Sequence, residues 1–411
     1  MHSLSSWICC QLGAREHYAI PRALHRSNHL QQLITDAWIS PYSLSDRLLA
    51  NVSSRLKERF HTDLVTAAVQ AFTPSLLLFE ATQKLCKTRD WDRMIQRNHW
   101  FQQQTLTYLK ANIHHFSPST ILFSYSYTAL SLFQFAKQQG WKTVLGQIDP
   151  GPLEEQRVTR EQQRYPELEP NWHPVPLHYW QTWQQECDLA DQIIVNSQWS
   201  KQLLTQTNLK PHKIQVVPLV YEPPKPTQEF CRTYPTQFSR DRPLRVLFLG
   251  IITLRKGIAP LLAAIEQLKD MPIEFWFVGS SQITTPPHLR RHPRVHWIGA
   301  IPRSETYRYY QLADVFIFPT ISDGFGLTQL EAQAWQLPLI TSRFCGEVIE
   351  NQRNGLVLPE VTEEAIVDAL KTCLNHPEQL KSWSIQSGKL KGFELAQLSQ
   401  RLQICQSALF T

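Results

Sequence analysis

The second half of the chain alternates short apolar runs with amphipathic runs, and this alternation constrains the fold more than any other feature. Its helical runs are the one that starts at Ile258 with apolar residues at helical spacing, one over 304–313 and one that begins near 327. The apolar runs, which are strand candidates, cover 245–250, 274–279, 294–300, 314–320, 338–342 and 355–359. Near-continuous apolar strands that alternate with amphipathic helices are typical of a parallel sheet covered on both faces. We therefore predict a doubly wound α/β domain.

The first half repeats this scheme less regularly. Its strand candidates, with helices between several of them, are 7–12, 32–38, 120–125, 142–148, 192–197 and 214–219. A proline-rich stretch without apolar periodicity lies between Pro218 and Pro243 and is typical of a domain connector. We predict a first domain over 1–220, a linker over 221–243, a second domain over 244–390 and a terminal helix over 391–411. Binding is expected in the cleft between the domains.

The terminal helix carries an apolar stripe that must be buried. The stripe consists of Leu395, Leu398, Leu402, Cys405 and Leu409. We predict that it packs back on the first domain. Peripheral contact with a membrane is the alternative, and it is disfavoured because the polar face is rich in Gln rather than Lys.

Composition narrows the setting. The net charge of +6 is spread along the 411 residues, which hints at anionic ligands and does not require nucleic acid. The eight cysteines include no Cys-x-x-Cys pair, which fits a reducing cytosol. No charged leader and no long apolar span is apparent, so we expect a cytoplasmic protein, with contact at the inner face of a membrane left open. The Asn51-Val-Ser sequon carries no weight in that compartment.

The loop after the strand at 245–250 contains adjacent cations. Arg255 and Lys256 precede Gly257 and a helix start. Free amides and the helix dipole favour negative charge there, so the loop is a candidate diphosphate site. The alternative is a basic pair exposed to solvent.

The loop after the strand at 314–320 reads SDGFGLTQLEAQAW over 322–335. Carboxylates bind sugar hydroxyls well, so Asp323 and Glu331 beside a diphosphate pocket point to a nucleotide sugar. The alternatives are structural: Thr328 and Glu331 have the spacing of a helix capping box, and Asp323 is then an ordinary loop acid.

Several segments resemble a known family. LGIITLRKGI (249–258), the run from Asp314 to Thr341, ADQIIVNSQWSKQLL (190–204) and KIQVVPL (213–219) are similar to the retaining nucleotide-sugar glycosyltransferases of family 4, the glycosyl transferases group 1. The similarity is good over about 185–360 and weak over the first 180 residues. It implies the GT-B fold, with two Rossmann-like domains, a cleft between them and a C-terminal helix that crosses back to the first domain.

The resemblance also implies roles for individual residues. Glu331 binds the donor ribose, Asp323 lies against the transferred sugar, and Arg255 with Lys256 holds the diphosphate. The catalytic set is then Arg255, Lys256 and Asp323. The donor, of UDP or GDP type, is bound at Gly13, Gly324, Phe325, Gly326, Leu327, Thr328 and Glu331. Neither a cofactor nor a metal is expected, because cations stabilise the leaving diphosphate.

The chain departs from the family pattern at four positions. The first acid is Asp323 where the family usually has Glu, and Ile251 stands where Arg is frequent, so Arg255 is expected to supply the second cation. Trp335 and Gln336 stand where glycine is common, which predicts altered local packing.

The first domain is expected to bear the acceptor. Gly13 ends a strand where the family's glycine loop lies beneath the donor, and Arg15 and His17 follow it. For His17, a solvated residue at a helix start is the alternative. Asp149 ends another strand, with a simple turn beside Pro150 as its alternative. The aromatic stretch 164–183 suits a sugar or lipid acceptor, or an ordinary packed loop.

These observations favour a glycosyltransferase that moves a sugar from a nucleotide-diphosphate donor to a hydroxyl acceptor with retention. Two alternatives remain: a non-catalytic protein that binds sugar nucleotides or partners an active enzyme, and a sugar-nucleotide epimerase on the same fold. A dinucleotide-dependent dehydrogenase is weaker, since no Gly-x-Gly-x-x-Gly follows a strand.

Overall fold

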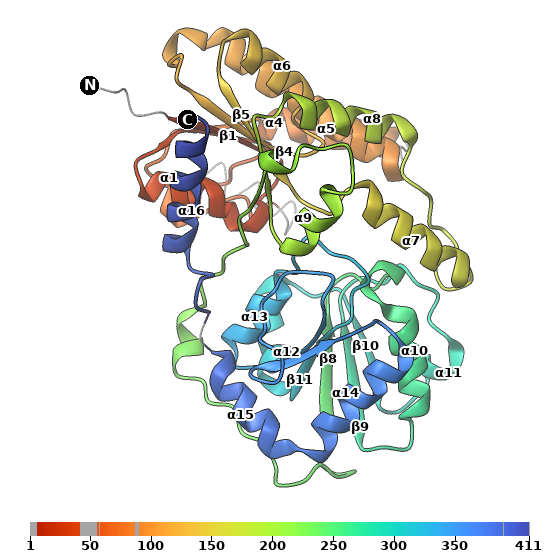
Figure 1. The fold of residues 1–411 in the computed structure, drawn as a ribbon. Coiled ribbons are helices and arrows are strands. Elements are labelled where there is room, and N and C mark those ends of the chain that lie inside the picture. Colours follow the sequence, from red (N-terminus) through yellow and green to blue (C-terminus); the bar gives the residue numbers. More distant parts are fainter. Residues whose placement is uncertain (1–5, 42–55, 57, 87–89, 389, 411) are drawn as a thin grey trace.

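The chain folds around two parallel sheets, one above the other in Figure 1. The computed structural model describes residues 6–41, 56, 58–86, 90–388 and 390–410. The Asn51 sequon lies outside the described residues. Within the described residues, no helix is both long and apolar enough to cross a membrane.

The first sheet has seven strands in the order β3-β2-β1-β4-β5-β6-β7. They are β1 Trp7–Gln11, β2 Leu30–Thr35, β3 Val69–Ala71, β4 Ile121–Tyr125, β5 Lys142–Gln147, β6 Gln192–Val195 and β7 Ile214–Val216. Its helices are α1 Ala19–Arg26, α4 Thr73–Leu85, α5 Asp90–Ala111, α6 Leu130–Gln138, α7 Pro152–Arg164, α8 Leu177–Leu189 and α9 Gln198–Leu204. The sequence analysis did not predict β3, a short strand of three half-buried residues.

The second sheet has six strands in the order β10-β9-β8-β11-β12-β13. They are β8 Leu244–Leu249, β9 Ile273–Val278, β10 Val295–Gly299, β11 Val315–Phe318, β12 Leu339–Ser342 and β13 Gly355–Leu358. Its helices are α10 Ile258–Gln267, α11 Pro287–Arg290, α12 Thr306–Leu312, α13 Thr328–Ala334, α14 Glu363–Asn375 and α15 Pro377–Ser387. All six strands coincide with the six apolar runs predicted for this half, and their bounds differ from the predicted ones by about one or two residues.

Both sheets bury both faces. Along β8, Val246 and Phe248 belong to one apolar cluster and Leu247 to another. Along β1, Trp7 and Cys9 belong to a different cluster from their neighbours. Because successive side chains of a strand point to opposite faces, this division means that helices cover both sides, which explains the continuous apolar runs.

The strand order reverses beside the first strand of each sheet. In the first sheet β1 lies between β2 and β4, and in the second β8 lies between β9 and β11. Ligands of open parallel sheets bind beyond the carboxyl ends of the strands at such reversals. The site residues predicted from the sequence lie in the loops after β1, β5, β8 and β11 or in α13.

The last helix, α16 Leu395–Ala408, lies against α1 of the first domain (Figure 1). Its predicted apolar stripe is buried in the same cluster as Trp7, whose indole Nε1 donates to Gln406 Oε1 over 2.8 Å. The Ser399 hydroxyl also donates to the carbonyl oxygen of Ala23 over 3.0 Å. The stripe is therefore covered by protein.

The proline-rich segment between the sheets is packed on the second domain in its later part. Phe238 joins that domain's core, and the buried Arg232 donates to carbonyl oxygens at the ends of α12 and α13. Those acceptors are Tyr310, Gln311, Ala313, Trp335 and Gln336. Arg232 thus fixes the two helices relative to each other.

Candidate active site

The loops after β8 and β11 are packed tightly against each other. Arg255 and Lys256 lie in a short 3-10 helix, Leu254–Lys256, that ends at Gly257 with φ +72°. A Cβ on Gly257 would lie 1.8 Å from the carbonyl oxygen of Pro319. The backbone amide of Ile321 donates to the carbonyl oxygen of Arg255 over 3.0 Å. Only glycine permits this approach, which brings the cations to the acids of the next loop.

Lys256 forms an ion pair with Asp323, and both side chains are largely buried. Burial, followed by the positive charge of Arg255, lowers the pKa of the Lys256 ammonium well below its ordinary value. The adjacent Asp323 carboxylate opposes that shift, since it favours the charged ammonium. The second oxygen of Asp323 accepts the amide of Phe325 over 3.2 Å. Asp323 is therefore a partner of the candidate phosphate-binding lysine.

Arg255 connects this pair to the first domain. Its Nη1 lies 3.3 Å from Glu154 Oε1 and 3.8 Å from Asp323 Oδ2. The guanidinium thus lies between one carboxylate from each domain, at the domain boundary.

Glu331 lies on α13 and does not cap it. Its carboxylate accepts a hydrogen bond from Arg303 Nη2 over 2.6 Å and another from the Tyr310 hydroxyl over 2.8 Å. No capping bond is made at the N-terminus of this helix. The capping-box alternative is therefore wrong, and the carboxylate is held by two donors.

The intervening residues define the shape of the loop. A Cβ on Gly324 would lie 2.2 Å from the carbonyl oxygen of Ile148, so glycine is required where the first domain makes contact. Phe325 is buried in an apolar cluster that Leu327 also contacts, and Gly326 has φ +85°. Thr328 is the first residue of α13. The amides of the next two residues, Gln329 and Leu330, donate to the carbonyl oxygens of Gly326 and Leu327, so both amides are used within the turn.

On the first-domain side, the loop after β1 has an unusual backbone. Gly13 has φ +86°, and its amide donates to Asp36 Oδ1 over 3.0 Å. The next turn holds Glu16, His17 and Tyr18 at φ 51°, 53° and 58°. Three consecutive non-glycine residues in the left-handed region are costly and are found at sites that the surrounding structure fixes.

His17 contacts the second domain. Its Nδ1 lies 3.0 Å from Nη1 of Arg303, the arginine that also holds Glu331. Burial, followed by the charge of Arg303, lowers the pKa of His17 to about 3, so its ring is neutral at cellular pH. The solvated alternative is wrong for His17. Arg15 is exposed, with its guanidinium 5.5 Å from the centre of the Tyr125 ring.

Asp149 is both a turn residue and a cleft residue. Its carboxylate accepts hydrogen bonds from the Tyr127 hydroxyl over 2.8 Å and from the Gly151 amide over 2.9 Å. Burial, followed by the nearby charge of Glu154, raises the pKa of Asp149 to about 6. The same side chain lines a cavity between the domains.

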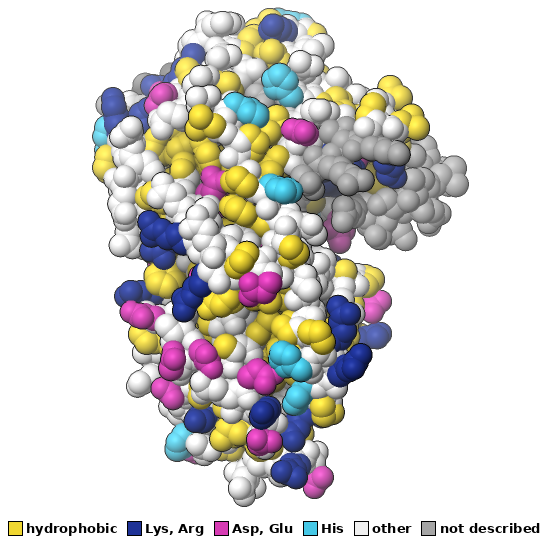
Figure 2. Space-filling model, turned by 90° about the vertical axis from the view of Figure 1, so that its right-hand side faces the viewer, with side chains coloured by type: hydrophobic (Ala, Val, Ile, Leu, Met, Phe, Trp, Pro, Cys, Tyr) yellow, Lys and Arg dark blue, Asp and Glu magenta, His cyan; other side chains and the backbone are white. Residues whose placement is uncertain are grey.

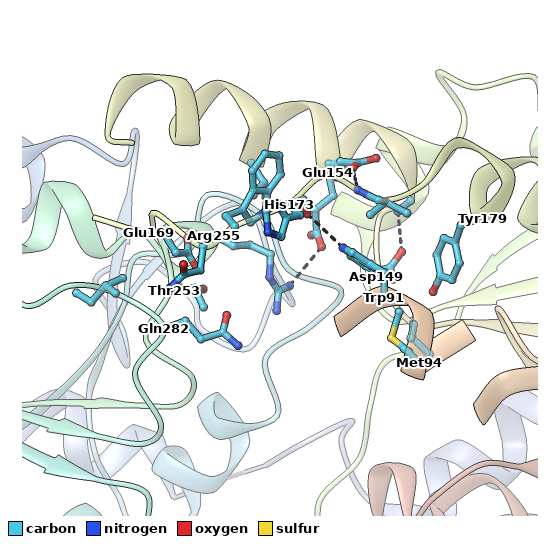
Figure 3. Close-up of a pocket in the computed structure, with 18 of the residues that line it drawn as sticks. Trp91, Met94, Asp149, Glu154, Glu169, His173, Tyr179, Thr253, Arg255 and Gln282 are labelled. Carbon is cyan, nitrogen blue, oxygen red and sulfur yellow. Dashed lines mark hydrogen bonds and ion pairs between the residues drawn. The ribbon is translucent and has the colours of Figure 1, made fainter. Parts of the chain in front are cut away.

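That cavity has a volume of about 870 Å³. Figure 3 shows Thr253, Glu169 and Gln282 toward one end, Trp91, Met94 and Tyr179 toward the other, and Arg255 reaching toward Glu154 between them. Figure 2 shows a face on which apolar side chains continue from the upper domain across the waist to the lower one, with acidic and histidine side chains among them.

The departures from the family pattern have local explanations. Ile251 supplies no cation, and its side chain is 49% exposed. Gln336 has φ +54°, a region that favours glycine, and its Nε2 donates to the carbonyl oxygen of Phe230 over 2.7 Å. Trp335 packs on the same Phe230 at 5.4 Å between ring centres. The altered packing at 335–336 therefore anchors the connector.

Three residues that matter here were missed by sequence reasoning. Arg303 and Tyr310 hold Glu331, and Glu154 holds Arg255. The available signals were positional: Arg303 follows β10 and Glu154 follows β5, both beyond carboxyl ends of strands. Among the described residues, no cluster of three His, Cys, Asp or Glu side chains is suited to a metal ion.

Comparison with solved structures defines the class of fold. A sucrose-phosphate synthase from Thermosynechococcus elongatus superimposes with a TM-score of 0.62 at 16% identity, covering 98% of this chain and 99% of that one. Anabaena Alr3699/HepE in complex with UDP and glucose gives a TM-score of 0.61 at 13% identity, covering 99% and 100%. The chain has the GT-B fold.

Sequence comparison defines the family of the second domain. Residues 243–376 match the family described as glycosyl transferases group 1, and this domain belongs to it. The D-inositol 3-phosphate glycosyltransferase of Corynebacterium urealyticum is 28% identical over 222 residues, 48% of this chain and 51% of that protein. The capsular polysaccharide biosynthesis glycosyltransferase CapM of Staphylococcus aureus is 26% identical over 138 residues, 31% and 36%. The chain thus matches about half of the first relative's length and less of the second.

Proposed function

We propose that this protein is a retaining glycosyltransferase that transfers a sugar from a nucleotide-diphosphate donor to a hydroxyl acceptor. The carrying observation is the arrangement at the edge of the second sheet: Arg255 and Lys256 lie against Asp323, after two neighbouring strands, at the boundary with the first domain. Supporting it are the family of the second domain and a neighbouring solved structure that contains UDP-glucose.

In this proposal the donor diphosphate lies against Arg255 and Lys256, and Glu331 accepts hydrogen bonds from the ribose. The bond between the anomeric carbon and the diphosphate oxygen breaks while the acceptor oxygen bonds to the same face of that carbon. The acceptor proton passes to the departing diphosphate. The two cations stabilise the negative charge that develops on this leaving group, in the role that a divalent ion has elsewhere.

The domain contacts support a closed site. Arg255 reaches Glu154, Arg303 reaches His17, and the indole of Trp199 donates to the Ser322 hydroxyl over 3.0 Å. These contacts join the loops that hold the candidate donor residues to the first domain. Opening of the domains would then admit substrate and release product.

The test is an assay with UDP- and GDP-sugars, with and without a mixed set of hydroxyl acceptors. The expected result is nucleotide release that acceptor accelerates, with a product of retained configuration. Nucleotide binding without release would instead support a non-catalytic binding protein. Conversion of the donor sugar with no acceptor present would support an epimerase.

A further inference from the structure

The cavity between the domains has an aromatic end. Trp91 and Tyr179 meet edge to face with ring centres 5.5 Å apart, and Tyr127 stacks on Tyr179 at 4.4 Å. All three rings line the cavity. Such rings offer a rigid apolar wall that costs little conformational entropy when a ligand packs on it.

Away from the aromatic end, the cavity lining includes two residues that each have a polar atom without a partner. Glu154 is only 9% exposed, and while its Oε1 faces Arg255, its Oε2 makes no hydrogen bond. The hydroxyl of Thr253 is likewise buried and unpaired. Thr253 occupies a helix N-cap position, yet its side chain makes no capping bond. Because buried polar groups are normally paired, these two atoms point to a ligand that supplies hydroxyl groups.

The charge of the cavity disfavours an anion. Among the residues that the structure describes, the lining includes four carboxylates, and Arg255 is its one Lys or Arg side chain. That guanidinium already faces two acids, Glu154 and Asp323. A phosphate or carboxylate placed here would meet more negative than positive charge, whereas an uncharged polyol would not.

We propose that this cavity is the acceptor site and that the acceptor is an uncharged sugar. After side-chain rotations that bring these two buried atoms to the cavity surface, one hydroxyl group donates to Glu154 Oε2 and another bonds to the Thr253 hydroxyl. A sugar ring packs at the aromatic end. The volume of about 870 Å³ is near the upper end of ligand pockets, so more than one ring fits. The proposal rests on the proposed function and sets this chain apart from its relative named for inositol 3-phosphate.

The experiment measures binding to the full chain, with maltose, cellobiose and lactose as neutral probes and glucose 6-phosphate as the anionic probe. Ligand-observed NMR gives the affinities, and UDP binding is titrated separately. We expect at least one neutral disaccharide to bind about 10-fold or more tightly than glucose 6-phosphate.

Two variants locate the site. Thr253→Val preserves the shape of the side chain and is expected to weaken binding of that disaccharide about 5-fold. Glu154→Gln is expected to weaken it about 10-fold, because hydrogen bonds to charged groups are stronger. Thr372→Val on α14, outside the cavity, is the matched control and should change nothing. Thr253→Val should also leave the UDP affinity unchanged.

The proposal is overturned if glucose 6-phosphate binds as tightly as every disaccharide, if no disaccharide binds, or if both cavity variants bind like the control. These results are separable from failure of the proposed function. Sugar binding that depends on Thr253, in a protein that binds no nucleoside diphosphate, would retain the cavity site and remove the transferase. UDP binding without any sugar binding would retain the donor site and reject the proposed acceptor site in the cavity.

Discussion

The two sides of Arg255 differ in how their polar groups are satisfied. On one side, Lys256 and Asp323 neutralise each other within the protein. On the other side, Glu154 Oε2 and the Thr253 hydroxyl are buried without partners. The first arrangement is stable without a ligand, and a diphosphate must compete with Asp323 to reach the lysine. The second is stabilised when a ligand arrives. The donor is therefore expected to exchange an existing ion pair, whereas the acceptor satisfies unpaired atoms.

The largest effect is expected when the lysine of the paired side is removed. Lys256→Met should reduce donor turnover about 100-fold, because a cation positioned at the developing charge is lost. It should also destabilise the fold, by less than the about 3–5 kcal/mol of a fully unpaired buried charge, because Asp323 then retains only Arg255, at 3.8 Å, as a neighbouring cation. Turnover by nucleotide release and thermal unfolding give the two values.

A double variant separates these two effects. Lys256→Met with Asp323→Asn removes the unpaired charge and should recover most of the stability, while turnover stays low. Lys371→Met, at an exposed position on α14, is the control for mutation of a lysine as such. Wild-type turnover in the double variant would contradict a role for Lys256 in donor chemistry.

A smaller effect is expected at Glu331. Glu331→Gln keeps the size of the side chain but removes its charge, and it should weaken nucleoside diphosphate binding about 10-fold through the loss of charge-assisted hydrogen bonds. Calorimetric titration with UDP and GDP measures it, with Glu364→Gln on α14 as the matched control. Equal affinities in the two variants would remove Glu331 from the donor site.

The contact between His17 and Arg303 makes a prediction about acid pH. The pKa of His17 is lowered to about 3 in the folded protein, against about 6.5 in an unfolded chain. The unfolded state then binds the extra proton between those values, so folded stability is present above pH 6.5 and is lost as pH falls toward 3. The slope from this one group is at most about 1.4 kcal/mol per pH unit.

The matched variant is His17→Gln, which retains a polar side chain beside Arg303 but does not titrate. Unfolding by denaturant at several pH values between 7 and 4 should show a shallower loss of stability in the variant than in the wild type. Parallel pH profiles would show that His17 is not the buried neutral group described here.

The smallest expected effect concerns Tyr310. Tyr310→Phe removes the hydroxyl that donates to Glu331 and leaves the ring in place. A hydrogen bond to a charged group contributes about 1.5–3 kcal/mol, but this one holds the carboxylate rather than the ligand, so UDP affinity should fall by only about 2- to 10-fold. An effect larger than that of Glu331→Gln, measured in the same titration, would mean that Tyr310 does more than position the carboxylate.

The second sheet was predictable because each of its strands is a nearly continuous apolar run that ends in a loop of special composition. The pairing of Lys256 with Asp323 follows from that pattern, since β8 and β11 are neighbours. β3 was not predictable, because three half-buried residues carry no period.

The contacts that complete the site could not be predicted from the sequence, for a different reason. Arg303 and Glu331 lie 28 residues apart in the chain, and Glu154 and Arg255 lie 101 apart across two domains. No spacing rule relates such pairs, because they meet only once strand order and domain placement are known. The unpaired atoms of the cavity are likewise a property of packing, which residue types alone do not reveal.

The central claim is that Lys256, with Arg255 and Glu331, holds a nucleoside diphosphate. The most direct measurement is a calorimetric comparison of UDP with UMP in the wild type and in the Lys256→Met, Asp323→Asn double variant. The account predicts that the wild type binds UDP more tightly than UMP and that the double variant loses most of this difference. Equal binding of the two nucleotides by the wild type, or an unchanged preference in the variant, would contradict it.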